Sequence, residues 1–189
     1  MSTKTTQTPV DNGVNLAALM DAREALGNEP DLAQFQWRVS STWKWGTHSQ
    51  NLVEKFTGLG GEQAHHTSFA YDVDHPEQFA SEDIGATPVE YVLVGLAGCL
   101  TAGIASIATL REIQLRAVTA TLEGDMDLQG TIGVDPTVRN GFSGIRVRYT
   151  IDADASEEDL EALVAQSQKR SAVFDIIANP TNVSVEVNK

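Results

Sequence analysis

The spacing of hydrophobic residues changes twice in the first third of the chain. Between residues 14 and 26, Leu16, Leu19, Met20 and Leu26 recur at helical intervals, which predicts a short accessory helix. A period-2 or β-rich pattern follows, separated by glycines, and it predicts three antiparallel strands. These strands are expected at residues 35–43, 51–56 and 65–73.

A strong helix-start signal stands before the most hydrophobic segment. Thr87 can cap the first turn, Pro88 suits the first helical position, and Glu90 lies three residues after the cap, as in a capping box. A long helix is therefore predicted from here to about residue 112. Residues 91–110 carry no charge and are long enough to cross a bilayer, but glycine, serine and threonine dilute the segment. We interpret it as a helix enclosed by protein on nearly every side and expect no membrane span.

The remaining pattern completes an α+β fold. Its order is βββ-α-ββ-α-β, with a long buried central helix and a mixed or shared sheet. One protomer of this size offers little cover for so apolar a helix, so a symmetric homodimer that encloses it is expected. Residues 1–34 are expected to form a polar leader with the accessory helix, disordered up to residue 12, and residues 35–189 one domain. After the central helix we predict strands at 117–128 and 145–151, a helix at 156–170, a helical turn at 171–178 and a strand at 183–187.

Charge and cysteine content exclude several classes of function. The 189 residues carry 13 Lys and Arg against 26 Asp and Glu, and a net charge of -13 disfavours nucleic acid and anionic membranes as partners. The single cysteine, Cys99, cannot form an internal disulfide or a zinc cluster. No apolar leader precedes the domain, so a cytoplasmic protein is expected. No cofactor is expected, and no metal either, because His66, Asp72 and Asp74 are spread too far along one strand to bind a single ion.

Cys99 lies on a face of small residues in the central helix. At 3.6 residues per turn, Gly95 and Gly103 share its side of the helix. One interpretation is close packing against another helix; the other is a pocket for a small apolar ligand above the sulfur. The thiol has no cation near it in the sequence and lies beyond the first helical turn, so a buried structural cysteine is an open alternative to a nucleophile.

Four separate segments carry recognisable motifs. They are GATPVE at 85–90, LAGCL at 96–100, the strand-loop-strand with LQG, GVDP, VR, GF and IRV between 128 and 147, and the late helix at 171–180. Together they closely resemble the OsmC/Ohr family, the osmotically inducible and organic hydroperoxide resistance proteins, over about residues 35–187. The resemblance implies an intertwined homodimer whose two central helices lie between two sheets, with pockets at the dimer interface, and it makes Cys99 the counterpart of the reactive cysteine.

The rest of the family's peroxidase machinery is missing. The resolving cysteine corresponds to Ser171 here, and the glutamate after the helix-opening proline corresponds to Val89. The catalytic arginine would lie near Tyr71 on the preceding strand, where no arginine occurs. Without these groups the thiolate fraction should be small, and an oxidised Cys99 would need an external thiol.

Three residues could replace the missing cation. His65 and His66 lie on the preceding strand, and Arg170 stands beside the vacated cysteine position, although a helix-end charge is the simpler explanation for Arg170.

The sequence thus predicts an OsmC-like protein of oxidative or hydroperoxide stress, with Cys99 as a weak or one-cysteine thiol peroxidase and Gly95, Gly103 and Ser171 lining its pocket. The alternative is a non-catalytic dimeric protein that binds a small ligand. A thiol enzyme of another kind, with a histidine as its base, is a third interpretation.

Overall fold

The computed structural model describes residues 10–187, and the chain divides into two compact units. We call residues 15–92 the sheet unit, and residues 1–14 together with 93–189 the core unit. Most of the leader that was predicted to be disordered, residues 1–9, lies outside the described residues.

The sheet unit begins with the predicted accessory helix, α1 (Leu16–Asn28), whose first turn is capped by the side chain of Asn15. A turn of 3-10 helix, η1 (Pro30–Ala33), connects α1 to the strands. The helix therefore exists as the spacing predicted, and it ends two residues later than expected.

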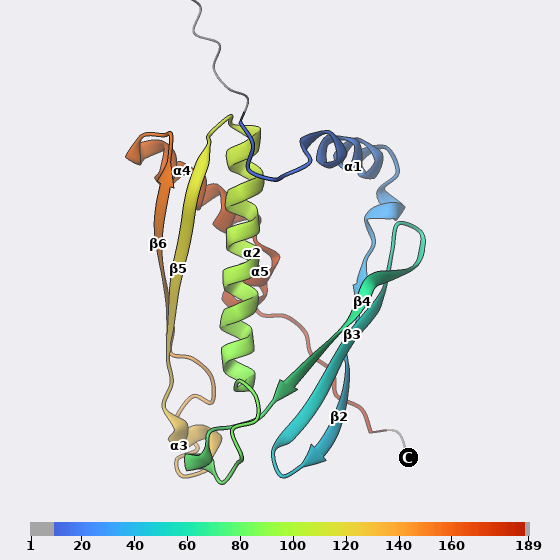
Figure 1. Ribbon diagram of the computed structural model, residues 1–189. Coiled ribbons are helices and arrows are strands. Elements are labelled where there is room, and N and C mark those ends of the chain that lie inside the picture. The colour runs from blue at the N-terminus through green and yellow to red at the C-terminus, as the bar shows by residue number, and fades with distance from the viewer. Residues whose placement is uncertain (1–9, 188–189) are drawn as a thin grey trace, which may run out of the picture. The chain divides into compact units, whose positions relative to one another are not determined.

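Four antiparallel strands form the sheet around β3 (Figure 1). The first predicted strand is split into two short strands, β1 and β2, which both pair with β3. Strand β4 pairs with the opposite edge of β3. The strands are β1 (Gln36–Trp37), β2 (Ser40–Trp45), β3 (His48–Gly58) and β4 (Gly61–Val73).

A wide bulge interrupts the pairing of β3 with β4. Val53 pairs with Phe69, but Lys55 pairs with Ala64, so residues 65–68 of β4 face a single residue of β3. Such an insertion bends the strand and changes the direction of its side chains. His65 and His66 therefore do not follow the strict alternation of a regular strand.

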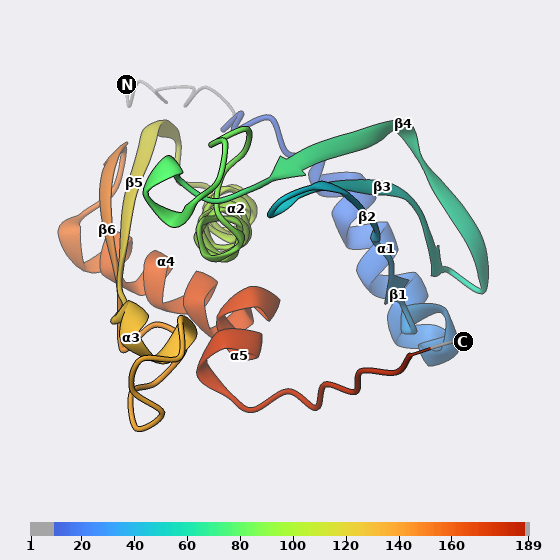
Figure 2. The same ribbon diagram turned by 90° about the horizontal axis from the view of Figure 1, so that it is seen from below.

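The core unit contains most of the central helix, packed with an antiparallel two-stranded ribbon and the C-terminal helices. Figures 1 and 2 both show α2 and α4 on the same side of the ribbon formed by β5 and β6. The elements are α2 (Pro88–Leu110), which begins in the sheet unit, β5 (Leu115–Asp125), α3 (Leu128–Thr131), β6 (Gly144–Ala153), α4 (Glu157–Arg170) and α5 (Ala172–Ala178).

The core forms along one stripe of α2. Ile104, Ile107 and Ala108 recur at helical spacing and pack against Ile113 and Leu163 of α4, each less than a tenth exposed. Side chains elsewhere on α2 are exposed, with 62% of Val94 accessible. Within the core unit the ribbon and α4 cover only this one stripe of the helix, so this unit alone does not enclose α2 on nearly every side.

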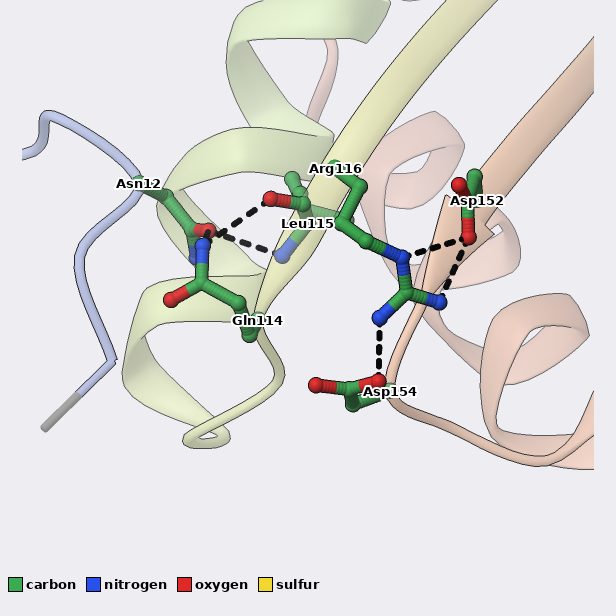
Figure 3. A network of polar contacts seen from close by, with 6 residues as sticks. All are labelled: Asn12, Gln114, Leu115, Arg116, Asp152 and Asp154. Carbon is green, nitrogen blue, oxygen red and sulfur yellow. Dashed lines mark hydrogen bonds and ion pairs between the residues drawn. The ribbon is translucent and has the colours of Figure 1, made fainter. Parts of the chain in front are cut away.

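Asn12 ties the N-terminal segment to the end of α2 and to the start of β5, and Figure 3 shows its bond with Leu115. Its amide nitrogen donates to Thr109 Oγ1 at 3.2 Å and to the Ile113 carbonyl at 2.9 Å, and its oxygen accepts from the Leu115 amide at 2.9 Å. Disorder was predicted up to residue 12, and for Asn12 this is wrong. The last turn of a helix leaves backbone groups unpaired, and a side chain with both donors and an acceptor can satisfy them.

The strand predicted at 183–187 is not present as a paired strand among the described residues. Val183, Val185 and Val187 alternate as a strand would, yet they are 83%, 88% and 85% exposed. A period-2 pattern indicates which face of a strand would be buried, but a strand forms only where the edge of a sheet can hydrogen bond to its backbone.

Candidate functional site

Cys99 lies on α2 where the corner between α4 and α5 meets it. The Ser171 hydroxyl donates a hydrogen bond to Cys99 Sγ at 3.1 Å, across 72 residues of sequence. Cys99 is half-buried, whereas Ser171 is only 5% exposed. The lone thiol therefore has one buried polar partner from a distant element.

Ser171 holds this position because it is shared by two helices. Its amide donates to the Gln168 carbonyl at 3.2 Å and closes α4, and its Oγ accepts the Phe174 amide at 3.1 Å as the N-cap of α5. Serine is favoured at such caps because its short side chain reaches the unpaired amides of the first turn. The capping bond fixes the hydroxyl so that its proton points to sulfur.

Opposing effects act on the ionisation of Cys99. Burial alone raises the pKa of its thiol, but the hydrogen bond from Ser171 and the amides of Val173 and Ala172 lower the pKa by more, so that it lies below its usual value. The sequence suggested a small thiolate fraction because no cation lies near Cys99. The neutral donors at the start of α5 shift the pKa in the direction that favours the thiolate, a contribution that the sequence did not reveal.

The two glycines predicted to line a pocket have different surroundings. A Cβ on Gly103 would lie 2.4 Å from Ser167 Oγ, so Gly103 permits the close approach of α4 to α2. A Cβ on Gly95 would make only an ordinary 3.9 Å contact with Val173 of α5. The packing interpretation thus suits Gly103, and Gly95 is the residue with room beside it.

Ser171 also lines a surface hollow of about 320 Å³ between α4 and α5. Lys169, Asp175 and Asn179 are among its walls, together with Ala165, Gln168 and Phe174. The hollow is mixed in polarity. This differs from the purely apolar pocket that the small residues of α2 suggested.

The three proposed substitutes for a cation are placed as follows. Arg170 is exposed at the end of α4, and within residues 10–187 no hydrogen bond or ion pair joins it to Cys99. The ring of His65 packs between Phe56 and Phe69 in the sheet unit, at centroid distances of 5.3 Å and 5.5 Å, and His66 is exposed. None of them is joined to the sulfur by a contact that the described residues show.

Glu90, next to the position of the family's glutamate, is committed to the predicted capping box. Its carboxylate accepts from the amide and hydroxyl of Thr87 at 2.8 Å and 2.9 Å, and these bonds lower its pKa. Val89 has no polar group to offer. The start of α2 thus folds as the sequence predicted, and its acidic group serves the helix end.

A second buried polar site lies in the sheet unit. The carboxylate of Asp74 is 1% exposed and accepts from the Thr47 hydroxyl at 2.6 Å and the Ile84 amide at 3.2 Å. The hydrogen bond from Thr47, assisted by backbone amides and opposed by burial, lowers the pKa of Asp74 to about 2. Throughout the described part of the chain, no three histidine, cysteine or acidic side chains gather in a way that could hold a metal ion.

The family model for OsmC-like proteins matches residues 80–186, more than half of the chain, and includes Cys99, Ser171 and all of α2. The chain belongs to the OsmC-like protein family. No curated protein sequence matches it.

Solved structures of OsmC-like proteins share its fold. An OsmC-like protein from Mycoplasma pneumoniae aligns with 76% of this chain and 87% of its own at 16% identity and a TM-score of 0.58. An organic hydroperoxide resistance protein OsmC from Legionella pneumophila aligns with 75% and 88% at 20% identity and a TM-score of 0.52. An OsmC-like protein of unknown function from Vibrio cholerae aligns with 74% and 92% at 11% identity and a TM-score of 0.54. The predicted α+β, OsmC-like fold is thereby confirmed.

The apolar character of α2 serves core packing along part of the helix. By length and composition this helix could cross a membrane. Its stripe at Ile104 and Ile107 packs against α4 and the ribbon in the core unit.

Proposed function

We propose that this OsmC-like protein reacts with organic hydroperoxides through Cys99, its sole redox thiol, as a one-cysteine and therefore weak peroxidase. The observation that carries the proposal is the pair formed by Cys99 and Ser171, in which a sulfur on the central helix has a buried hydroxyl donor at 3.1 Å. Lowering the pKa of a thiol increases the fraction that is ionised to the thiolate, the nucleophilic form.

The proposed reaction transfers one oxygen atom. The Cys99 thiolate attacks the terminal oxygen of R–O–O–H, the O–O bond breaks, and Cys99 becomes a sulfenic acid while the released alkoxide takes a proton to become an alcohol. Sulfur loses two electrons and the hydroperoxide gains them. The reaction needs neither a cofactor nor a metal.

Return to the thiol requires an external reductant, because Ser171 cannot form a disulfide. A low-mass thiol would displace water from the sulfenic acid to give a mixed disulfide, and a second thiol molecule would release Cys99 and form the reductant's disulfide. Each turnover thus depends on two collisions in place of one intramolecular step, which supports the expectation of slow catalysis.

Mass measurement tests the first step directly. Purified protein is treated with cumene hydroperoxide, and Cys99 is expected to gain one oxygen atom, trapped by a sulfenic-acid reagent. The Cys99→Ala variant, with no other cysteine in the chain, is the control for oxidation elsewhere. An unmodified thiol under excess hydroperoxide would contradict the proposal.

A non-catalytic binding function is the second candidate. It is favoured by the replacement of the family's glutamate by Val89 and by the engagement of Glu90 in the helix cap. Binding predicts that Cys99→Ala leaves the cellular phenotype unchanged while Gly95→Phe abolishes it. Gly95 is the better probe because a side chain on Gly103 would disturb the packing of α4.

We further infer a homodimer. The alternating residues Val183, Val185 and Val187 are almost fully exposed, and Val94 on α2 is exposed too. An extended apolar segment whose backbone pairs with no strand among the described residues is suited to adding to a sheet edge, and a second copy of this chain supplies such an edge. The same copy would cover the part of α2 that the ribbon and α4 do not cover.

The homodimer is tested by light scattering after size-exclusion chromatography. We expect a dimer mass for the full chain and a monomer mass for Val185→Asp, with Ser184→Asp, a charge on the other face of the same segment, as the matched control. A monomeric full chain would contradict the inference.

The remaining expectations complete the proposal. The acidic composition and single cysteine support a cytoplasmic protein, and the motif span supports an OsmC-like domain at 35–189 behind a leader at 1–34. For the activation of Cys99, Ser171 is a simpler source than His65, His66 or Arg170, because Ser171 donates a hydrogen bond to the sulfur.

A further inference from the structure

The sulfur site poses a specific problem. In the family that this chain resembles, a cation steadies the thiolate, and here the corresponding positions hold no cation. Of the charged side chains at the α4–α5 corner, Lys169 and Arg170 on α4 and Asp175 on α5, none hydrogen bonds to Cys99 within the described residues. A thiolate at Cys99 must therefore be held by neutral donors.

Ser171 has the geometry of such a donor. A hydroxyl has one proton and two lone pairs. Phe174 donates its amide to one lone pair at 3.1 Å, and the proton is directed to Cys99 Sγ at 3.1 Å. With 5% of Ser171 exposed, water competes little for that proton, which makes the bond to a charged acceptor stronger.

We propose that Ser171 is a functional residue of the Cys99 site, whose hydroxyl, oriented by the cap of α5, holds the reactive sulfur as a thiolate and so takes the place of the absent cation. This inference rests on the proposed function for its purpose, but its physical content, the bond from oxygen to sulfur, is separate from any reaction with a hydroperoxide. The residue that replaces the family's second thiol thus acquires a role of its own.

The inference differs from a merely structural role for Ser171. If the side chain only capped α5, removing it would lower stability without altering the ionisation of Cys99. Ser156 provides the comparison, because its hydroxyl caps α4 by accepting the Asp159 amide at 3.1 Å and its site is exposed. Ser167 provides a second comparison, since it is buried on α4 and donates to the Leu100 carbonyl at 2.6 Å.

The experiment measures the rate of alkylation of Cys99 by iodoacetamide against pH. Only one cysteine reacts, so the midpoint of the profile is that of Cys99. For Ser171→Ala we expect the midpoint to rise by about one pH unit and the rate near neutral pH to fall about tenfold. Ser171→Thr keeps the hydroxyl and should therefore show most of the wild-type pH profile. Ser156→Ala and Ser167→Ala should have the same midpoint as the wild type.

An unchanged midpoint in folded Ser171→Ala would overturn the inference. If this variant does not fold, Ser171→Asp serves in its place, since a carboxylate still caps α5 but cannot donate and should raise the midpoint further. The two proposals can fail separately. If the midpoint shifts in Ser171→Ala but wild-type Cys99 does not react with cumene hydroperoxide, Ser171 is still the hydrogen-bond donor to the thiolate and only the peroxidase proposal is refuted.

Discussion

The sites at Cys99 and Asp74 use the same kind of hydrogen bonding with different chemical consequences. In the core unit the Ser171 hydroxyl and nearby amides face a sulfur; in the sheet unit the Thr47 hydroxyl and nearby amides face a carboxylate. Both arrangements favour the charged form and lower the pKa. The starting values differ, however, and so does the exposure of the two groups.

The difference determines which site can be chemical. A carboxylate is ionised at neutral pH anyway, so lowering the pKa of Asp74 to about 2 adds stability and no reactivity. A thiol is mostly protonated at neutral pH, so lowering its pKa increases the nucleophilic form. Asp74 is 1% exposed and Cys99 is half-buried, which leaves only the sulfur open to a reactant.

Conversion of the donor at the sulfur site into a second thiol should have the largest effect. Ser171→Cys places a thiol within bonding reach of Cys99, given the present 3.1 Å separation. After hydroperoxide treatment, we expect most molecules to lose both free thiols and form an internal disulfide, with one water released from the sulfenic acid. Thiol counting and mass measurement check this, and Ser156→Cys, at an exposed position, is the control. Two free thiols after treatment would show that positions 99 and 171 are not aligned for a disulfide.

Removal of the acceptor in each site should distinguish structure from chemistry. Asp74→Ala removes the buried acceptor of the Thr47 hydroxyl and the Ile84 amide, and we expect its Tm to fall by roughly 5 °C or more. Cys99→Ala leaves Ser171 bonded to Phe174 and should change the Tm by less than about 2 °C. Scanning calorimetry measures the Tm of both variants. Equal losses in Tm would show that Cys99 contributes as much to stability as Asp74 does.

Acid should weaken the sheet unit through Asp74. Folding lowers the pKa of this carboxyl to about 2, so the unfolded chain binds the proton more tightly than the folded one. The stabilisation is therefore fully present above the usual carboxyl pKa of about 4 and is lost as the pH falls toward about 2. Urea unfolding followed by tryptophan fluorescence, to which nearby Trp45 contributes, should show a smaller dependence on pH in this window for Asp74→Asn.

The last comparison concerns how closely α4 approaches α2, the helix that carries Cys99. Gly103→Ala places a Cβ 2.4 Å from Ser167 Oγ, and we expect a loss of about 1–3 kcal/mol in the free energy of unfolding. Gly98 has no atom within 4 Å of such a Cβ, and Gly98→Ala should stabilise the helix by about 0.5–1 kcal/mol. Chemical denaturation compares the pair, and a stabilised Gly103→Ala would mean that α4 does not depend on this contact.

Local patterns predicted local structure well. The capping signal at Thr87 and Glu90 forms as expected, because its bonds lie within one helical turn. The spacing of Leu16 and Leu19 predicted α1 for the same reason. The placement of Cys99 on the central helix needed only the period of that helix.

Errors arose where a residue depends on a distant partner. Asn12 was predicted to be disordered because its own neighbours are polar, but its partners Thr109 and Ile113 lie about a hundred residues away. A serine before a helical turn signals a cap, so the cap at Ser171 was predictable, whereas its contact with a sulfur 72 residues earlier was not.

The sequence by itself determined most of the helices and strands, the family and the single thiol, since these depend on residue type and short-range spacing. Only the tertiary structure decided what that thiol faces. The corner between α4 and α5 brings a capped, buried hydroxyl to Cys99, and the ionisation of a group depends on the donors around it rather than on its neighbours along the chain. The lone cysteine thus obtains its electrostatic environment from packing.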